Sequence, residues 1–320
     1  MTGNLAGILR KLGDKPWIWS YLGMILIWLA TVTYTMGQGG GSIISAALSF
    51  ATFTVIVGIG QMFVITTGPG NVDLSIPATI ALSGAICMKV MDGSNAMLPV
   101  GVLIALGTGI AVGAFNYMLI RVLRIPPIIA TLSASFLILS TAIAYGRGLK
   151  IKPPPLLADF TTMKIAGIPL LAVFIIVFAI LASILLNRTL YGRSVLAIGQ
   201  NMRAAWLAGI NVERIRYATY TLSAILAGFC GLLLAGFSGG ASLDMGSEYL
   251  LASIAVVVIG GTSVAGGKSN IPGIWGASLF MFLLVTMLNT FGASAGIRLI
   301  MTGLIIVAVI TVAGGDKQQR

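Results

Sequence analysis

The polar side chains best placed to do chemistry lie in one glycine-rich break, 68-GPGNVDLSIP-77. Its proline and glycines should stop the apolar helix before it, and Asp73 or Ser75 can cap the next helix by accepting its free N–H groups. One interpretation is a simple turn between two helices. The other is a broken helix that lines a cavity, which is how membrane proteins present polar groups to a polar solute. In that case Asn71, Asp73 and Ser75 lie along the path of the solute.

Other kinds of chemistry are disfavoured by composition. The chain has no histidine and only 8 acidic residues, whereas zinc sites and catalytic triads usually need histidine, and proton-coupled carriers usually hold ionisable groups inside their helices. Hydrophobic residues make up 58% of the chain, 41 residues are glycine, and the mean hydropathy is +1.03. These values indicate an integral membrane protein without a soluble catalytic module.

The stretch 255-AVVVIGGTSVAGGKSN-270 resembles a phosphate-binding loop because a β-branched run leads into Gly267-Lys268-Ser269. That loop requires four residues between its first glycine and the Gly-Lys pair. Here five residues separate Gly261 from Gly267, and the sequence continues into another apolar run. We therefore expect this chain to bind no nucleotide and no cofactor of its own.

Apolar runs of about 20 residues, the length that crosses a bilayer core, recur along the whole chain. They predict an all-α integral membrane protein of about ten transmembrane helices, with broken helices and one short cytoplasmic helix. The predicted spans are residues 17–36, 43–67, 74–91, 96–120, 125–146, 170–187, 217–238, 249–262, 271–290 and 297–314.

The basic residues predict the orientation of these spans. Most Lys and Arg fall in the two termini and in the joints 121–124, 188–216 and 263–270, which favours a cytoplasmic N-terminus and C-terminus under the positive-inside rule. The domains predicted from this are a cytoplasmic segment 1–16, a single membrane domain 17–314 and a tail 315–320. The external joint 147–169 contains three consecutive prolines, which favour a stiff extended segment over a helix.

Three smaller expectations follow from residues inside the apolar runs. Cys87 and Cys230 should be buried hydrophobic residues rather than a disulfide or a metal pair. Asn116 should make a hydrogen bond between helices, and the glycines of 107-GTGIAVG-113 should let helix backbones approach closely within one bundle.

The longest predicted cytoplasmic joint, 188–216, has a local organisation that a plain basic loop would not need. Good helix formers follow Arg203, namely Ala204, Ala205, Leu207 and Ala208. Asn201 can cap the start of such a helix, and Gly209 can end it. A short helix of two or three turns is therefore predicted, with its surface, including Ala205, facing a soluble partner.

The pattern 199-GQNMRAAWLAGI-210 resembles the cytoplasmic coupling loop in the permease subunits of bacterial ATP-binding cassette importers, in the ribose and simple-sugar branch related to branched-chain amino acid permeases. Two further segments resemble motifs of this family in the same order: 70-GNVDLS-75, near its translocation pathway, and the glycine block 260-GGTSVAGGKSNIPGIWGA-277. The family commonly has a second glycine where this chain has Asn71, which puts ribose itself in doubt. The coupling positions matched are Gly199, Asn201, Ala204, Ala205, Gly209 and Ile210.

The resemblance implies a multi-pass protein of the bacterial inner membrane that imports a monosaccharide or similar solute by alternating access. The expected partners are two ATPase subunits, which use the ATP, an extracytoplasmic sugar-binding protein, and a second permease, identical or related. The coupling loop would dock on the ATPase, with Arg203 and Leu207 also placed in it. Two alternatives remain open: a stand-alone carrier or channel, and a membrane-embedded transferase acting on a lipid-linked sugar.

Overall fold

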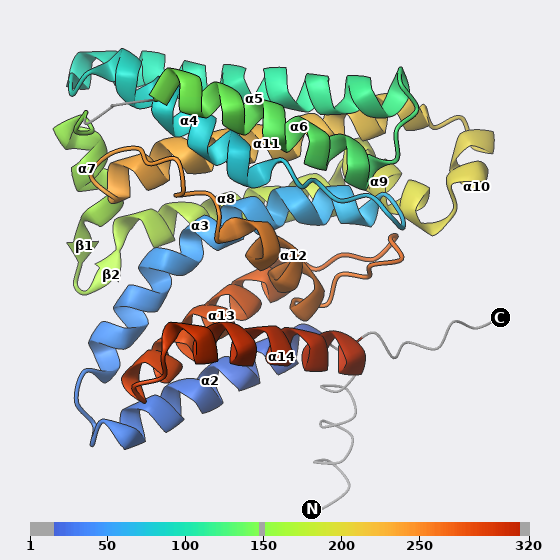
Figure 1. Cartoon of the computed structure of the whole chain (residues 1–320). Helices are drawn as coiled ribbons and strands as arrows, with labels where there is room; N and C mark the ends of the chain where they lie inside the picture. Colours follow the sequence, from blue (N-terminus) through green and yellow to red (C-terminus); the bar gives the residue numbers. More distant parts are fainter. Residues whose placement is uncertain (1–15, 147–150, 314–320) are drawn as a thin grey trace, which may run out of the picture.

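The structure is a computed structural model that describes residues 16–146 and 151–313, and most of these residues lie in α-helices. The long helices pack side by side in a bundle (Figure 1). In chain order the elements are α2 (Pro16–Tyr34), α3 (Gly40–Thr66), α4 (Ile76–Met91), the 3-10 turn η1 (Asn95–Met97), α5 (Leu98–Arg121), α6 (Pro127–Gly146), α7 (Pro155–Thr162), β1 (Lys164–Ile165), β2 (Ile168–Pro169), α8 (Leu170–Arg188), α9 (Leu190–Gln200), α10 (Met202–Leu207), α11 (Val212–Phe237), α12 (Tyr249–Ile259), α13 (Ile271–Thr290) and α14 (Ala295–Ala313).

Six helices of the described part are long and apolar enough to cross a membrane: α3, α5 with η1, α6, α8, α11 and α13. Three shorter apolar helices accompany them, within α2, α4 and α12. The 11 residues of α12 extend only about 16 Å at 1.5 Å per residue, roughly half of a bilayer core. The all-α membrane fold is confirmed, while the count of ten spans stays a prediction.

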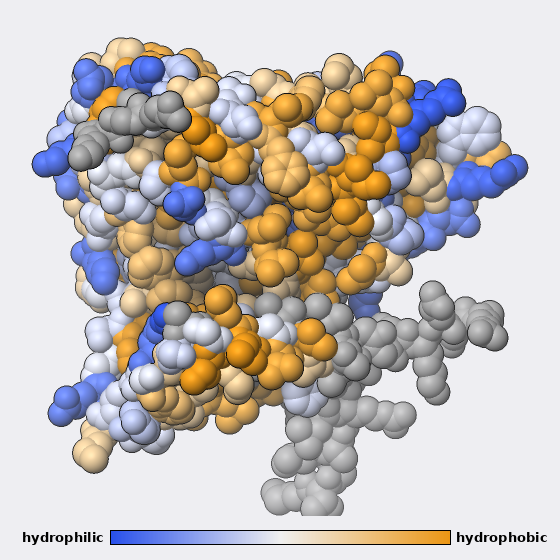
Figure 2. Space-filling view, in the orientation of Figure 1, coloured by the Kyte–Doolittle hydropathy of each residue, from blue (hydrophilic) through white to orange (hydrophobic). Residues whose placement is uncertain are grey.

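The helices differ in the surface that they bury. Most of α3 and α11 is buried, whereas α6 and α8 expose apolar side chains such as Phe136 and Leu181. Figure 2 shows apolar side chains across the middle of one face and hydrophilic side chains gathered at the end that carries α9 and α10. This distribution is expected when α3 and α11 form the core of the bundle and the outer helices face lipid.

Glycines on α5 allow its backbone to lie directly against that of α11. A Cβ atom added at Gly109 would clash with the backbone of Ile225, and one added at Gly113 would clash with the backbone of Thr221. These two glycines are four residues apart and therefore share one face of α5. The predicted close packing within one bundle is confirmed.

The connections gather at two opposite ends of the bundle (Figure 1). One end carries α9, α10 and the chain turns that follow α3, α5 and α12; we call it the α10 end. The opposite end carries α7 and the β1–β2 hairpin, in which Ile165 pairs with Ile168. The predicted break at 68–77 and the predicted short helix therefore meet at the same end of the molecule.

The prediction of an extended segment in the joint 147–169 is wrong for part of that range. The chain forms α7 and a short β-hairpin there, and Pro155 is the first residue of α7. Proline is tolerated in the first turn of a helix because the N–H that it lacks would have no partner there. Residues 147–150 of this joint lie outside the described residues, as do the terminal segments 1–15 and 314–320.

Two expectations about isolated side chains in the apolar runs are confirmed. Cys87 and Cys230 are free and buried. Asn116 on α5 donates a hydrogen bond of 2.7 Å from Nδ2 to Oγ of Ser75, which precedes α4.

Candidate functional site

The break between α3 and α4 is a buried polar segment held by its own aspartate. The backbone reverses at Gly68 and Gly70, whose φ angles are +125° and +77°, values that favour glycine. The Asp73 side chain is 1% exposed, and its Oδ1 accepts hydrogen bonds from the backbone N–H of Ser75 at 3.0 Å and from its hydroxyl at 2.6 Å. Asp73 therefore fixes the turn that leads into α4.

One face of α11 holds this segment at two of its residues. Oδ1 of Asn71 accepts hydrogen bonds from Nη2 of Arg216 at 2.8 Å and from the hydroxyl of Tyr220 at 3.1 Å. Oδ2 of Asp73 accepts from the hydroxyl of Ser223 at 2.8 Å. Residues 216, 220 and 223 are spaced by four and three, so they lie on one side of the helix. The break is therefore attached to the central helix α11 and is not a free turn.

Three other helices contact the same segment. The backbone N–H of Asp73 donates to Oε1 of Gln61 on α3, and that of Leu74 donates to Oγ1 of Thr131 on α6, each at 3.1 Å. Ser75 accepts from Asn116 on α5, as described above. Gln61 and Thr131 satisfy backbone N–H groups that would otherwise be buried without a hydrogen bond. The segment thus joins α3, α5, α6 and α11.

Two polar atoms beside the segment are buried without a hydrogen-bond partner among the described residues: Nε2 of Gln61 and Oδ1 of Asn116. Both side chains are 0% exposed. A buried donor or acceptor without a partner is costly, so such atoms need an explanation. One donor and one acceptor of this kind match the hydrogen-bonding capacity of a hydroxyl group.

The short predicted helix is present as α10, with both of its predicted end signals, although its six residues make fewer than the two or three turns predicted. Oδ1 of Asn201 accepts from the backbone N–H of Ala204 at 2.9 Å, and Gly209 has a φ angle of +84° just after the helix. The segment before it, which the sequence did not single out, forms a further helix, α9. Oδ1 of Asn211 then caps α11 by accepting from the N–H of Arg214 at 3.0 Å.

The expectation that Ala205 forms part of the outer surface of this helix is wrong. Ala205 is 4% exposed and packs in a small cluster with Ile198 of α9 and Val212 of α11. The outer surface is instead formed by Trp206 and Leu207, which are 65% and 70% exposed. Ala205 thus anchors α10 to its neighbours, and two large apolar side chains are presented outward. Of the remaining predicted coupling residues, Arg203 and Ala204 are exposed and Ile210 is half-buried.

Near the end of α9, Gly199 joins this region to the buried break. A Cβ atom at Gly199 would clash with the carbonyl oxygen of Thr66 at the end of α3 and with the amide nitrogen of Gly267. Those two groups are themselves hydrogen-bonded, at 3.0 Å. A Cβ at Gly266 would lie 2.6 Å from Cα of Gly68. Three backbone segments therefore meet without intervening side chains; we call this contact the glycine junction, formed by Thr66, Gly68, Gly199, Gly266 and Gly267.

Tyr191 of α9 supplies a second contact between α9 and the core. Its ring stacks on Phe63 of α3, with ring centroids 5.9 Å apart, and its hydroxyl lies 3.0 Å from Oγ1 of Thr219 on α11. Tyrosine is neutral at physiological pH, and burial raises the pKa of Tyr191 further, to about 12, so its hydroxyl stays protonated in this contact.

Comparisons with known proteins place this arrangement in a family. A family model described as branched-chain amino acid transport system / permease component matches residues 43–310. The ribose import permease protein RbsC of Escherichia coli is 29% identical over 311 residues, covering 95% of this chain and 96% of that protein. A probable ABC transporter permease, y4mJ, of Sinorhizobium fredii is 30% identical over 268 residues, covering 83% of this chain and 79% of that protein.

The fructose import permease protein FrcC of Rhizobium meliloti is 31% identical over 266 residues, covering 80% of this chain and 73% of that protein. No solved structure matches the chain. The family and the six long apolar helices make this a multi-pass inner membrane protein. The chain is a permease of an ATP-binding cassette importer and belongs to the branched-chain amino acid transport system / permease component family.

Proposed function

We propose that this chain imports a monosaccharide or a similar small polar solute by alternating access. Related permeases are named for ribose and fructose, and the buried break offers groups that suit hydroxyls. Nε2 of Gln61 and Oδ1 of Asn116 lack partners in the described part of the chain, and they would become available to a solute when the helices around them separate. In this proposal Asn71, Asp73 and Ser75 keep the break in shape along the path.

The energy source is a separate ATPase subunit, which uses the ATP, while this chain carries no cofactor. The observation that carries this proposal is the outward presentation of Trp206 and Leu207 on α10, because two large exposed apolar side chains on a capped helix suit docking into a cleft of another protein. The glycine junction connects α9, the helix directly before the docked helix α10, with the end of α3 where the break begins. An extracytoplasmic sugar-binding protein and a second permease complete the assembly.

If α10 docks on the ATPase, a change on its outer surface should weaken the association of the permease with the ATPase without preventing membrane insertion. Leu207→Asp places a charge on the docking surface, where its desolvation would oppose association. We expect the variant to reach the membrane and to lose co-purification with the ATPase, together with most of the solute uptake. The measurement is pull-down of the ATPase by tagged permease, followed by uptake in reconstituted vesicles.

A matched control is Leu156→Asp. Leu156 is exposed on α7, at the end of the bundle opposite α10, so this change should leave ATPase association intact. The coupling proposal fails if Leu207→Asp retains the ATPase or if both variants lose it equally. Solute transport by the purified chain in vesicles that contain no ATPase would contradict the importer mechanism as a whole.

The proposed orientation places the α10 end in the cytoplasm, with ten passes of the chain. Nine are the six long helices with α2, α4 and α14, and the tenth is the short α12 together with the segments on either side of it. Arg203 is exposed at the α10 end, and Met163 is exposed at the end of α7. A single cysteine at position 163 should react with a membrane-impermeant thiol reagent in cells whose outer membrane is permeabilised and whose inner membrane is intact. A single cysteine at position 203 should react only after the cells are lysed. The reverse pattern would invert the orientation.

A further inference from the structure

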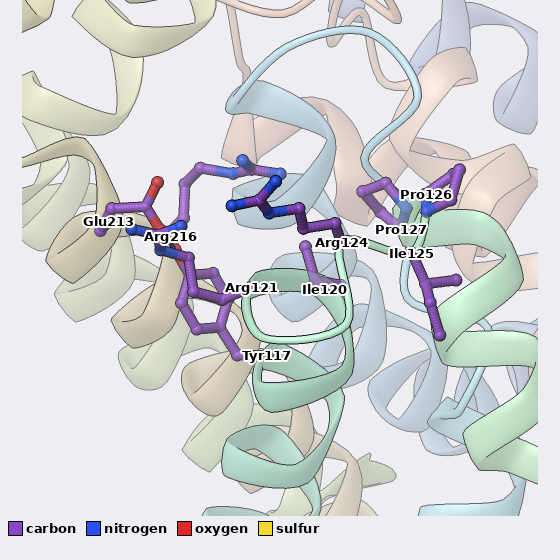
Figure 3. A pocket seen from close by; sticks show the side chains of 9 residues that line it. All are labelled: Tyr117, Ile120, Arg121, Arg124, Ile125, Pro126, Pro127, Glu213 and Arg216. Carbon is purple, nitrogen blue, oxygen red and sulfur yellow. Dashed lines mark hydrogen bonds and ion pairs between the residues drawn. The ribbon is translucent and has the colours of Figure 1, made fainter.

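A cavity of about 430 Å³ opens at the α10 end between the turn that follows α5 and the first turns of α11. Figure 3 shows that arginines from three places line it: Arg121 at the end of α5, Arg124 in the turn and Arg216 on α11. Glu213 is the acidic residue among its lining side chains. The cavity therefore gathers three positive charges and one negative charge.

The single carboxylate is already engaged. Oε2 of Glu213 lies 2.9 Å from Nε of Arg121 and accepts a hydrogen bond of 2.5 Å from the hydroxyl of Tyr117. This leaves Arg124 and Arg216 without a counter-charge among the residues that line the cavity. Because like charges repel more strongly at a partly desolvated surface than in bulk water, the arrangement favours a bound anion.

The guanidinium of Arg124 supplies available donors, whereas Arg216 contributes its positive charge to the cavity. Arg216 uses Nη2 to hold Asn71, while its Nε is buried without a partner among the described residues. Arg124 has a φ angle of +54°, a conformation that is uncommon for a residue with a side chain, and the described residues offer its guanidinium no hydrogen-bond or ion-pair partner. Guanidinium groups bind phosphate oxygens with paired N–H donors, which makes phosphate the anion that fits best.

The surroundings of the cavity distinguish a lipid from a free anion. Exposed aliphatic side chains flank it on the same turn and on the first turn of α6: Val122, Leu123, Ile128 and Ile129 are between 43% and 68% exposed. They lie where α5 ends and α6 begins, which is the level of the lipid headgroups if these two helices span the membrane. A phosphate with acyl chains attached would satisfy the arginines and cover these side chains together.

We propose that the cavity formed by Arg121, Arg124 and Arg216 binds the phosphate headgroup of an anionic phospholipid of the same membrane leaflet. Because Arg216 also holds Asn71, the bound lipid contacts a residue that positions the buried break. The proposal depends on the membrane placement of α5 and α6 and does not depend on which solute is imported.

The test uses the full-length purified permease in detergent and native mass spectrometry, titrated with phosphatidylglycerol or phosphatidylcholine, and with inorganic phosphate as competitor. We expect at least one phosphatidylglycerol to bind in preference to phosphatidylcholine. Arg124→Gln should weaken that binding by about tenfold, the loss expected for a charge-assisted hydrogen bond. Its guanidinium has no partner within the described residues, so the variant should fold, which its thermal unfolding temperature will verify.

Arg188→Gln is the matched control, because Arg188 is an exposed arginine at the end of a different long helix, α8, and lies outside the cavity. Normal phosphatidylglycerol binding by this variant, with weakened binding by Arg124→Gln, supports the site. Equal losses in both variants, or equal binding of the two phospholipids, would show non-specific attraction and overturn it. Displacement of the lipid by millimolar inorganic phosphate would overturn the lipid assignment in favour of a free-anion site.

Discussion

Replacing Gly199 with alanine should strongly reduce coupled uptake and lower the thermal stability of the permease. The added Cβ would clash with the carbonyl oxygen of Thr66 and the amide nitrogen of Gly267, both of which are backbone groups that no rotamer change can move. Forcing extra atoms into a packed contact typically costs about 1–3 kcal/mol. The hydrogen bond of 3.0 Å between those two groups would also be strained or lost.

The loss of solute uptake should be larger than the loss of thermal stability would explain, because the glycine junction is where α9 contacts both the end of α3 and the loop after α12. If α10 is displaced by a docked ATPase, this contact carries the displacement toward the buried break. We expect uptake to fall by about tenfold or more while some folded protein still reaches the membrane, since the estimated cost is a fraction of a typical folding free energy. ATP hydrolysis by the assembled transporter would then continue without solute stimulation.

Gly107→Ala is the matched control for this change. Gly107 lies within α5, and an added Cβ there would have no atom within 4 Å. Alanine is favoured over glycine in a helix interior by about 1 kcal/mol, so this variant should be as stable as the parent or more so, with normal uptake. If Gly199→Ala behaves in the same way, the glycine junction is not a constraint on the transport cycle.

Local sequence signals predicted local structure well. The Asn201 cap and the Gly209 turn were predicted because each depends on one side chain or one φ angle and a few neighbouring backbone atoms. The inward orientation of Ala205 was not predicted. A helix of six residues has too few turns for apolar periodicity to select its buried face, so the cluster with Ile198 and Val212 decides it.

The partners of the break were harder to predict, because they come from distant parts of the chain. Asn71 and Asp73 stood out as polar residues beside apolar helix, but their partners Arg216, Tyr220 and Ser223 lie 145 to 150 residues further on. A signal for them was present: polar residues at 216, 220 and 223 share one face of an apolar span, which indicates a buried polar partner. α7 was not predicted because consecutive prolines usually indicate an extended chain. In this protein the last of the three prolines is instead the first residue of a helix, a position where proline is tolerated.

Removing the Asp73 carboxylate should destabilise the permease more than any change to an exposed acidic residue. In Asp73→Ala, three donors lose their acceptor: the N–H and hydroxyl of Ser75 and the hydroxyl of Ser223. A buried polar group left without a partner costs about 1–3 kcal/mol, and the site is 1% exposed, so little water can replace the carboxylate. We expect a large drop in the thermal unfolding temperature in detergent and loss of uptake.

Two graded variants separate hydrogen bonding from charge at this site. Asp73→Asn keeps one acceptor for Ser75 and can donate from its amide to the hydroxyl of Ser223, so it should unfold close to the parent temperature. Ser223→Ala removes one of the three donors and should cost about 1 kcal/mol. Asp244→Ala, at an exposed position, should cost nothing. If Asp73→Asn is as unstable as Asp73→Ala, the negative charge and not the hydrogen bonding holds the break to α11, and Arg216, bound to the neighbouring Asn71, becomes the group that balances it.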